Sequence, residues 1–123
     1  MAKRVALITG GMGGLGETIS TKMADAGYTV AVTYSPSNKS SGMWLNDMKG
    51  RGYDFKAHPC DVASYESCEA CCKAVVADLG PIDILVNNAG IGKIGPVELA
   101  PLSTFRDGLL PLLQLLHALT LVQ

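Results

Sequence analysis

The chain has 123 residues, a formal net charge of −1, 48% apolar residues and 17% charged residues. This length holds one domain or part of one, since domains commonly run to about 100–150 residues. The apolar fraction predicts a packed core and argues against disorder. The near-neutral charge, without a block of Lys or Arg, argues against a nucleic-acid partner and against a polybasic membrane surface.

Neither end of the chain resembles a targeting or membrane segment. The first apolar run, residues 5–8, is shorter than the roughly 7–15 apolar residues of a secretory signal. The leucine-rich stretch 109–122 is shorter than the ~20 residues that cross a bilayer, and it contains Pro111, Gln114 and His117. We therefore expect a cytoplasmic, soluble chain with no membrane partner.

Four short apolar runs alternate with three segments of helical length. The runs predict strands at residues 5–9, 29–34, 55–61 and 82–87. The helices are expected from the glycine cluster to Ala26, over 43–49 and over 65–79. In the first helix Leu15, Ile19 and Met23 recur every four residues, which predicts a buried face, and Gly27 follows as its C-terminal cap. Ser64 is the expected N-cap of the third helix.

This β-α-β-α-β-α-β succession predicts an α/β fold, a Rossmann-type doubly wound parallel sheet. Four strands in the order 3-2-1-4 form only its first half, so we expect a truncated sheet followed by a leucine-rich C-terminal helix. The predicted division is a dinucleotide-binding half-domain over 1–91 and a divergent tail over 92–123. Because few tail residues are polar, the tail is expected to be buried in its own chain or in a partner, a homo-oligomer included.

The segment Thr9-Gly10-Gly11-Met12-Gly13-Gly14-Leu15-Gly16 joins the first strand to the first helix. It fits G-x-G-x-x-G over 11–16 and also the wider spacing T-G-x-x-x-G-x-G. Glycines let the backbone approach a pyrophosphate, and the helix start directs N–H groups and a positive dipole at it. Between a buried strand and an amphipathic helix, this pattern predicts a dinucleotide site.

The residues after the second strand favour NADP(H) over NAD(H). An NAD site usually carries Asp or Glu about 20 residues after the glycines, to bind the ribose 2′-OH. Here residues 33–39 contain no acid, and Ser35, Asn38 and Lys39 offer groups that hold a 2′-phosphate. A merely polar loop is the alternative.

Two further motifs, Asp61-Val62 and Asn87-Asn88-Ala89-Gly90, complete a family pattern. Together with the glycine segment they resemble the short-chain dehydrogenase/reductase family over about residues 2–91. The glycine segment, Trp44 and the stretch 84–91 most resemble its bacterial NADPH-dependent acetoacetyl-CoA reductases. The resemblance implies hydride transfer from NADPH to a 3-oxoacyl thioester.

The resemblance also implies roles for individual residues. The pyrophosphate and ribose would be lined by Gly10, Met12, Gly13, Gly14, Leu15 and Gly16. Ser35, Asn38 and Lys39 would hold the 2′-phosphate. Asp61 would bind the adenine amino group and Val62 would pack on its ring. The strand end beneath the ribose and nicotinamide would be formed by Asn88, Ala89, Gly90 and Ile91. For Asn87 a structural tie between strands and a role in the site are both open.

No catalytic residue is predicted. The family uses a Ser, a Tyr-x-x-x-Lys pair and an Asn, but no lysine stands four residues after Tyr28, Tyr34, Tyr53 or Tyr65. The best interpretation is the NADP-binding part of a short-chain reductase without its catalytic half. The alternatives are a non-catalytic dinucleotide-binding or interaction module and a truncated or mis-framed product.

Four cysteines lie close in sequence at 60, 68, 71 and 72. Within the third helix the last three continue into Val75, Val76 and Leu79 with the spacing of a core-facing stripe, where a thiol behaves as a small apolar group. A redox pair would need its first Cys at a helix N-terminus, and zinc would need a fourth ligand. We therefore predict a core stripe and no metal, with a metal or redox site as the alternative.

Overall fold

The structure is a computed structural model that describes residues 3–88. In this range the order is β1 (Val5–Ile8), α1 (Gly14–Asp25), β2 (Thr29–Tyr34), α2 (Ser41–Gly50), β3 (Lys56–Pro59), α3 (Tyr65–Leu79) and β4 (Ile82–Val86). All pairings are parallel and the strand order is β3-β2-β1-β4. The predicted α/β class and strand order are confirmed. The predicted boundary at residue 91, the leucine-rich tail and its self-association lie outside the described residues.

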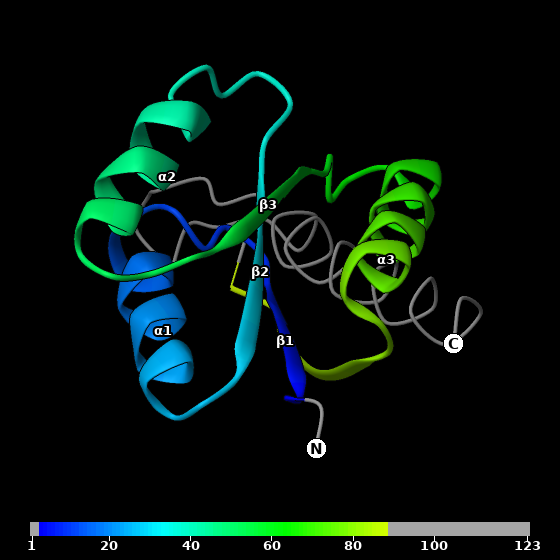
Figure 1. Cartoon of the computed structure of the whole chain (residues 1–123). Helices are drawn as coiled ribbons and strands as arrows, with labels where there is room; N and C mark the ends of the chain where they lie inside the picture. The colour runs from blue at the N-terminus through cyan, green and yellow to red at the C-terminus, as the bar shows by residue number, and fades with distance from the viewer. Residues whose placement is uncertain (1–2, 89–123) are drawn as a thin grey trace, which may run out of the picture.

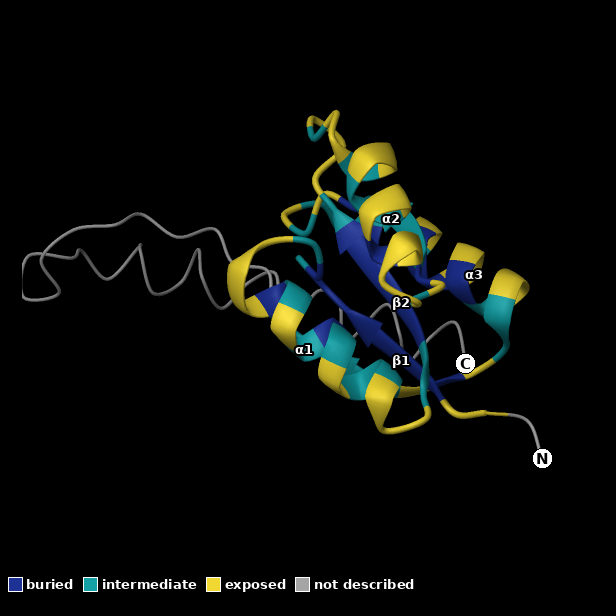
Figure 2. Cartoon of the chain, turned by 60° about the vertical axis from the view of Figure 1, so that its left-hand side comes forward, coloured by how far each residue is buried: buried dark blue, intermediate teal, exposed yellow. Residues whose placement is uncertain are grey.

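Helices cover both faces of the sheet. Figure 1 shows the sheet nearly edge-on, with α1 and α2 on one side and α3 on the other. Along β1, Val5 and Leu7 belong to the core under α3, whereas Ile8 belongs to the core under α1 and α2. Both β1 and β2 are therefore buried along their length, as Figure 2 shows. This explains why their sequences are continuous apolar runs.

The helix ends follow the predicted signals. After α1 the Gly27 N–H donates to the Ala24 carbonyl and the Tyr28 N–H to the Met23 carbonyl, and Gly27 has φ 98°. This pattern is a Schellman motif, which confirms Gly27 as the cap. At the start of α3 the Ser64 hydroxyl accepts from the Ser67 N–H at 3.3 Å, which confirms the predicted N-cap.

The prediction of a buried α1 face was wrong for Leu15. Ile19 and Met23 do pack on the core, but Leu15 is 69% exposed. The buried residues of the helix are instead two small ones, Gly16 and Ser20. The four-residue apolar spacing identified the helix correctly, but it wrongly included Leu15 in the buried face.

The cysteines form part of the core, as predicted. Cys60, Cys68, Cys71 and Cys72 are buried beneath β1 and β2, and no group of three or more His, Cys, Asp or Glu within residues 3–88 is arranged to hold a metal. Burial raises the pKa of Cys68 to about 12 and that of Cys72 to about 11. A hydrogen bond with Cys71, together with burial, raises the pKa of Cys60. These thiols are therefore protonated at neutral pH.

No helix in the described part of the chain combines the length and apolar character needed to span a membrane.

We expect the four buried thiols to resist modification in the folded chain. The thiolate is the reactive form, and the raised pKa values of Cys60, Cys68 and Cys72 keep these three thiols neutral at pH 8, whereas unfolded cysteines titrate near pH 8.5. Burial at 3% exposure shields Cys71 from the reagent. Ellman's reagent at pH 8 should react slowly with the native chain and should react with four thiols in urea. A fast reaction of two or more thiols in the native chain would instead favour the redox interpretation.

Candidate functional site

The predicted binding residues lie at one edge of the sheet. The strands are parallel, so their carboxyl ends point the same way. The glycine loop (residues 9–16) follows β1, the polar loop (residues 35–39) follows β2, Asp61 follows β3, and Asn88 follows β4. This edge is where α/β sheets bind ligands. The predicted residues Ala89, Gly90 and Ile91 lie outside the described residues.

The glycine loop holds α1 close to the end of β1. A Cβ atom on Gly16 would collide with the Gly10 carbonyl, and it would lie 2.9 Å from the Asn88 side-chain nitrogen. Gly10 has φ 63°, in the left-handed region that favours glycine. By contrast, a Cβ on Gly13 would meet no atom within 4 Å. Gly16 is therefore required for packing, whereas Gly13 leaves open space above the loop.

Hydrogen bonds attach this loop to the neighbouring strands. The Gly10 N–H donates to the Thr33 hydroxyl at 3.3 Å, and the Asn88 amide donates to the Gly10 carbonyl at 3.1 Å. The Thr9 N–H donates to the Val86 carbonyl at 3.0 Å. Asn88 thus positions the glycine loop from the end of β4.

Asn87 lies beside the same loop. Its carbonyl oxygen accepts from the Thr9 hydroxyl at 3.4 Å, a contact between the ends of β4 and β1. Its side-chain amide nitrogen is buried and has no hydrogen-bond partner among residues 3–88. The first contact supports the interpretation of Asn87 as a tie between strands.

Sequence reasoning missed Ser20, a buried residue of α1. Its hydroxyl lies 3.0 Å from the Gly11 carbonyl and 2.8 Å from the Gly16 carbonyl. It is fully buried, and a Cβ on Gly11 would lie 2.8 Å from its oxygen. Ser20 therefore stabilises the glycine loop from within α1. The available signal was a small polar residue four positions after Gly16, on the same helical face.

The start of α1 provides donors for an anion. Gly13 is the N-cap and has no side chain to cap the helix. The Gly16 N–H donates to the Gly13 carbonyl at 2.8 Å, but the N–H groups of Gly14 and Leu15 precede the first acceptor that the helix provides. Leu15 is exposed, so solvent and ligands reach this turn. Such a turn attracts phosphate through its N–H groups and its dipole.

The loop after β2 contributes hydroxyls and a cation. Ser35 and Ser37 are exposed, and their hydroxyl oxygens lie 2.9 Å apart. The Asn38 carbonyl oxygen accepts from the N–H and from the hydroxyl of Ser40, at 2.8 Å each, so this atom organises the loop. Lys39 is exposed. Residues 33–40 contain no carboxylate that would repel a phosphate.

Asp61 and Val62 lie at the end of β3. The Asp61 carboxylate is exposed and accepts from the Ala63 N–H at 3.1 Å, which holds it in place. Val62 is half-buried against the core beneath α3. The pair thus offers an anchored acceptor beside an apolar side chain.

Two of the tyrosines are unsuited to acid–base chemistry. The Tyr53 hydroxyl donates to Asp25 at 2.9 Å, a bond that raises the pKa of Tyr53. Tyr65 lies beside Glu69, and burial together with this carboxylate raises the pKa of Tyr65. A phenol that transfers protons at neutral pH needs its pKa lowered instead.

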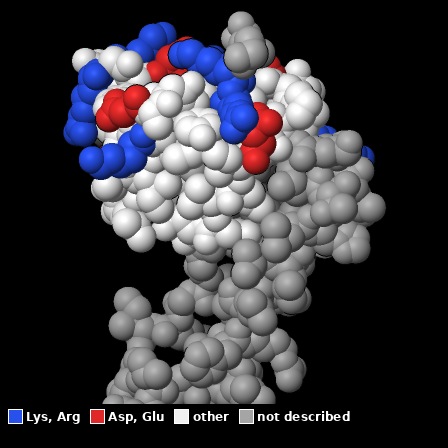
Figure 3. All heavy atoms as spheres, turned by 90° about the horizontal axis from the view of Figure 1, so that it is seen from below, with Lys and Arg blue, Asp and Glu red and all other residues white. Residues whose placement is uncertain are grey.

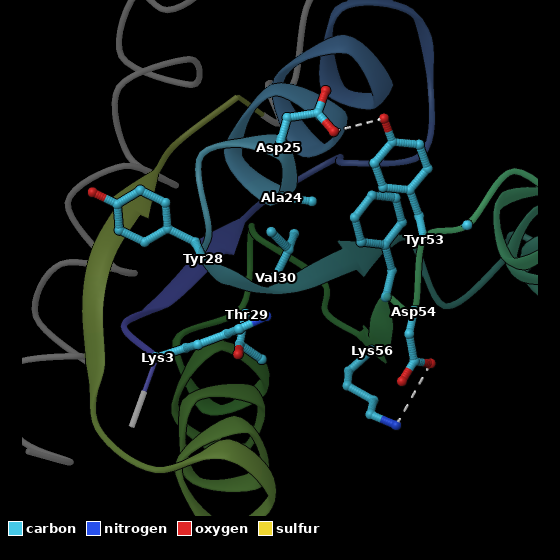
Figure 4. Close-up of a pocket in the computed structure, with 11 residues that line it drawn as sticks. Lys3, Ala24, Asp25, Tyr28, Thr29, Val30, Tyr53, Asp54 and Lys56 are labelled. Carbon is cyan, nitrogen blue, oxygen red and sulfur yellow. Dashed lines mark hydrogen bonds and ion pairs between the residues drawn. The ribbon is translucent and has the colours of Figure 1, made fainter. Parts of the chain in front are cut away.

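A separate hollow of about 370 Å³ lies at the opposite edge of the sheet, near the start of β2 (Figure 4). Four of its polar side chains pair with one another: Tyr53 with Asp25, and Lys56 with Asp54 at 4.0 Å. On the face of the molecule seen in Figure 3, acidic side chains lie beside basic ones. The hollow is remote from the glycine loop and forms no part of the candidate site.

Comparison with known proteins agrees with this geometry. The sequence model of the short chain dehydrogenase family matches residues 4–109. Over 93 residues the chain is 44% identical to Nodulation protein G of Azospirillum brasilense and 37% identical to an acetoacetyl-CoA reductase of Cupriavidus necator. Each match covers 76% of this chain and 38% of the relative, so the chain is about half as long as these relatives.

A solved structure of an actinorhodin polyketide ketoreductase variant with NADPH is also similar. It has a TM-score of 0.80 and 28% sequence identity, over 97% of this chain and 48% of that chain.

Replacing Gly16 and Gly13 in turn by alanine tests which of the two glycines is required for packing. We expect Gly16→Ala to lower the free energy of unfolding by about 2–4 kcal/mol, because the new methyl group forces the loop away from α1. Gly13→Ala should lower it by no more than about 1 kcal/mol, because Gly13 has an extended backbone and free space, and only the advantage of glycine over alanine as an N-cap is lost. Urea unfolding followed by circular dichroism measures both. Equal destabilisation by the two variants would contradict this description of the loop.

Proposed function

The chain belongs to the short-chain dehydrogenase family, and on that premise we propose that residues 3–88 bind NADP(H) for a reductase. The observation that carries the proposal is the glycine loop, where open space at Gly13 lies beside the helix start that presents N–H donors. A pyrophosphate fits this environment because no Cβ atom blocks it and the helix dipole favours its charge. When bound, the reduced cofactor supplies the hydride.

A preference for NADPH over NADH follows from the loop after β2. The extra 2′-phosphate needs donors and a cation, which Ser35, the Asn38 amide and Lys39 supply. An NAD site would instead be expected to carry a carboxylate at this place, and residues 33–40 have none. The similar ketoreductase structure with NADPH supports this choice.

The remaining predicted contacts complete the adenosine site. In the proposal Asp61 accepts from the adenine amino group and Val62 packs on the ring. Asn88 acts by holding Gly10, and the stretch from Ala89 to Ile91 continues the strand end beneath the ribose. The glycine loop contributes Gly10, Met12, Gly13, Gly14, Leu15 and Gly16.

We further propose a 3-oxoacyl thioester, such as acetoacetyl-CoA, as the substrate of the whole reductase. The acetoacetyl-CoA reductases among the relatives support this assignment. This chain has no Tyr-x-x-x-Lys pair, so in the proposal its described residues bind and orient the cofactor while the proton donor lies elsewhere in the working enzyme. The four free buried thiols support a cytoplasmic location, where thiols stay reduced.

Cofactor titration tests the proposal. We expect NADPH fluorescence to show saturable binding that is at least tenfold tighter than NADH binding. Lys39→Ala should weaken NADPH binding about five- to tenfold, because a cation facing the 2′-phosphate is lost, and should leave NADH binding unchanged. Lys49→Ala is the matched control, because Lys49 is also an exposed lysine but lies in the last turn of α2.

Equal affinities of the unaltered chain for NADPH and NADH would refute the proposed preference. A loss of NADPH affinity in both lysine variants would show a general charge effect instead of a 2′-phosphate contact.

A further inference from the structure

Two hydrogen bonds join helix α1 to the segment that contains α2 and the start of β3. The Trp44 indole N–H donates to the Glu17 carboxylate at 2.9 Å, and the Tyr53 hydroxyl donates to the Asp25 carboxylate at 2.9 Å. The Tyr53 end of this arrangement is visible in Figure 4. Glu17 lies in the first turn of α1, and Asp25 is its last residue. The helix is therefore held near both ends.

Stacked rings connect these two bonds. Trp44 stacks on Phe55 with ring centroids 5.4 Å apart and planes 13° apart, and Tyr53 stacks on the same ring at 5.4 Å and 14°. Phe55 is buried at 6% exposure. Flat side chains wedged in this way lose little further freedom when they form a hydrogen bond, so the Trp44 indole is held ready to donate to Glu17.

The Trp44 bond joins two residues that closely follow the two phosphate-binding loops of the proposed site. Glu17 directly follows Gly16, the last residue of the glycine loop. Trp44 is in the first turn of α2, five residues after Lys39, and its backbone N–H donates to the Ser40 carbonyl at 3.0 Å. One side-chain bond thus links the helix that begins at the glycine loop to the helix that follows the polar loop.

We propose that Trp44 and Glu17 are positioning residues that determine the selectivity for NADPH. Their bond fixes the distance between the glycine loop and the Ser35–Lys39 loop, so that one cofactor reaches the α1 start and the 2′-phosphate donors together. This inference rests on the proposed NADP(H) binding. The Tyr53 bond lies at the other end of α1, away from both loops, and has no such role.

The test compares NADPH and NADH affinities in the full chain. Trp44→Phe keeps an aromatic ring on Phe55 but removes the indole donor. Its NADPH dissociation constant should rise about five- to tenfold, because the 2′-phosphate donors are no longer held at the right distance. Its NADH constant should change less than twofold, because NADH makes no 2′-phosphate contact. A general loss of folding would move both constants alike.

Three further variants make the test specific. Tyr53→Phe removes the same kind of bond at the far end of α1 and should leave the NADPH to NADH ratio unchanged. Glu17→Gln keeps an oxygen acceptor for the indole and should keep the ratio, whereas Glu17→Ala should lower it as Trp44→Phe does. Because both changes break one bond, the Trp44→Phe, Glu17→Ala double variant should lose no more selectivity than either single variant.

The outcomes distinguish the positioning role of Trp44 and Glu17 from the proposed binding of NADP(H). A selective unaltered chain, with Trp44→Phe and Glu17→Ala keeping its ratio, would overturn the positioning role and leave the proposed function intact. A Tyr53→Phe variant that loses selectivity equally would also overturn it. If the unaltered chain binds both cofactors equally, the proposed NADPH preference and this inference fail together, and if it binds neither, the proposed function fails as well. If Trp44→Phe does not fold, the Glu17→Ala and Glu17→Gln pair gives the same decision.

Discussion

The close approach of Gly16 to the Gly10 carbonyl is the contact on which the rest of the site depends. It places the first turn of α1 directly against the chain that leaves β1. The N–H groups at the helix start then point toward the carboxyl edge of the sheet. Ser20 below the loop and Asn88 beside it are bonded to the backbone of the same loop. The packing of α1 and the direction of its N–H donors therefore both depend on the absence of a side chain at residue 16.

The second requirement is that the carboxyl edge stay fixed while both faces of the sheet are covered. On one face α3 rests through thiols and valines on a core that includes Val5 and Leu7 of β1 and Ala31 of β2. On the other face α1 and α2 meet the aromatic stack of Trp44, Phe55 and Tyr53. Loops that bind ligands need such a rigid base, because their own backbone has few apolar contacts.

The features that could be predicted from sequence are those with a local signature. The strand order followed from buried runs alternating with helices, the Gly27 and Ser64 caps from residue type, and the cysteine stripe from helical spacing. Leu15 was misplaced because a four-residue spacing does not show that Gly16 and Ser20 are the buried residues of the helix. The Trp44–Glu17 bond joins residues 27 positions apart, and no local pattern identifies such a tertiary pair. The roles of the binding residues remain predictions, since they depend on a ligand.

Cofactor recognition and proton transfer are separable in this chain for an electrostatic reason. Recognition of a phosphorylated dinucleotide needs N–H groups, hydroxyls and a cation, all of which the edge beside β1 and β2 provides. Proton transfer by a phenol needs a neighbouring cation that lowers its pKa. Tyr53 and Tyr65 lie beside carboxylates, and their pKa values are raised. The described residues are thus equipped to hold the hydride donor. Substitutions among them should therefore change the affinity for the cofactor more than they change turnover.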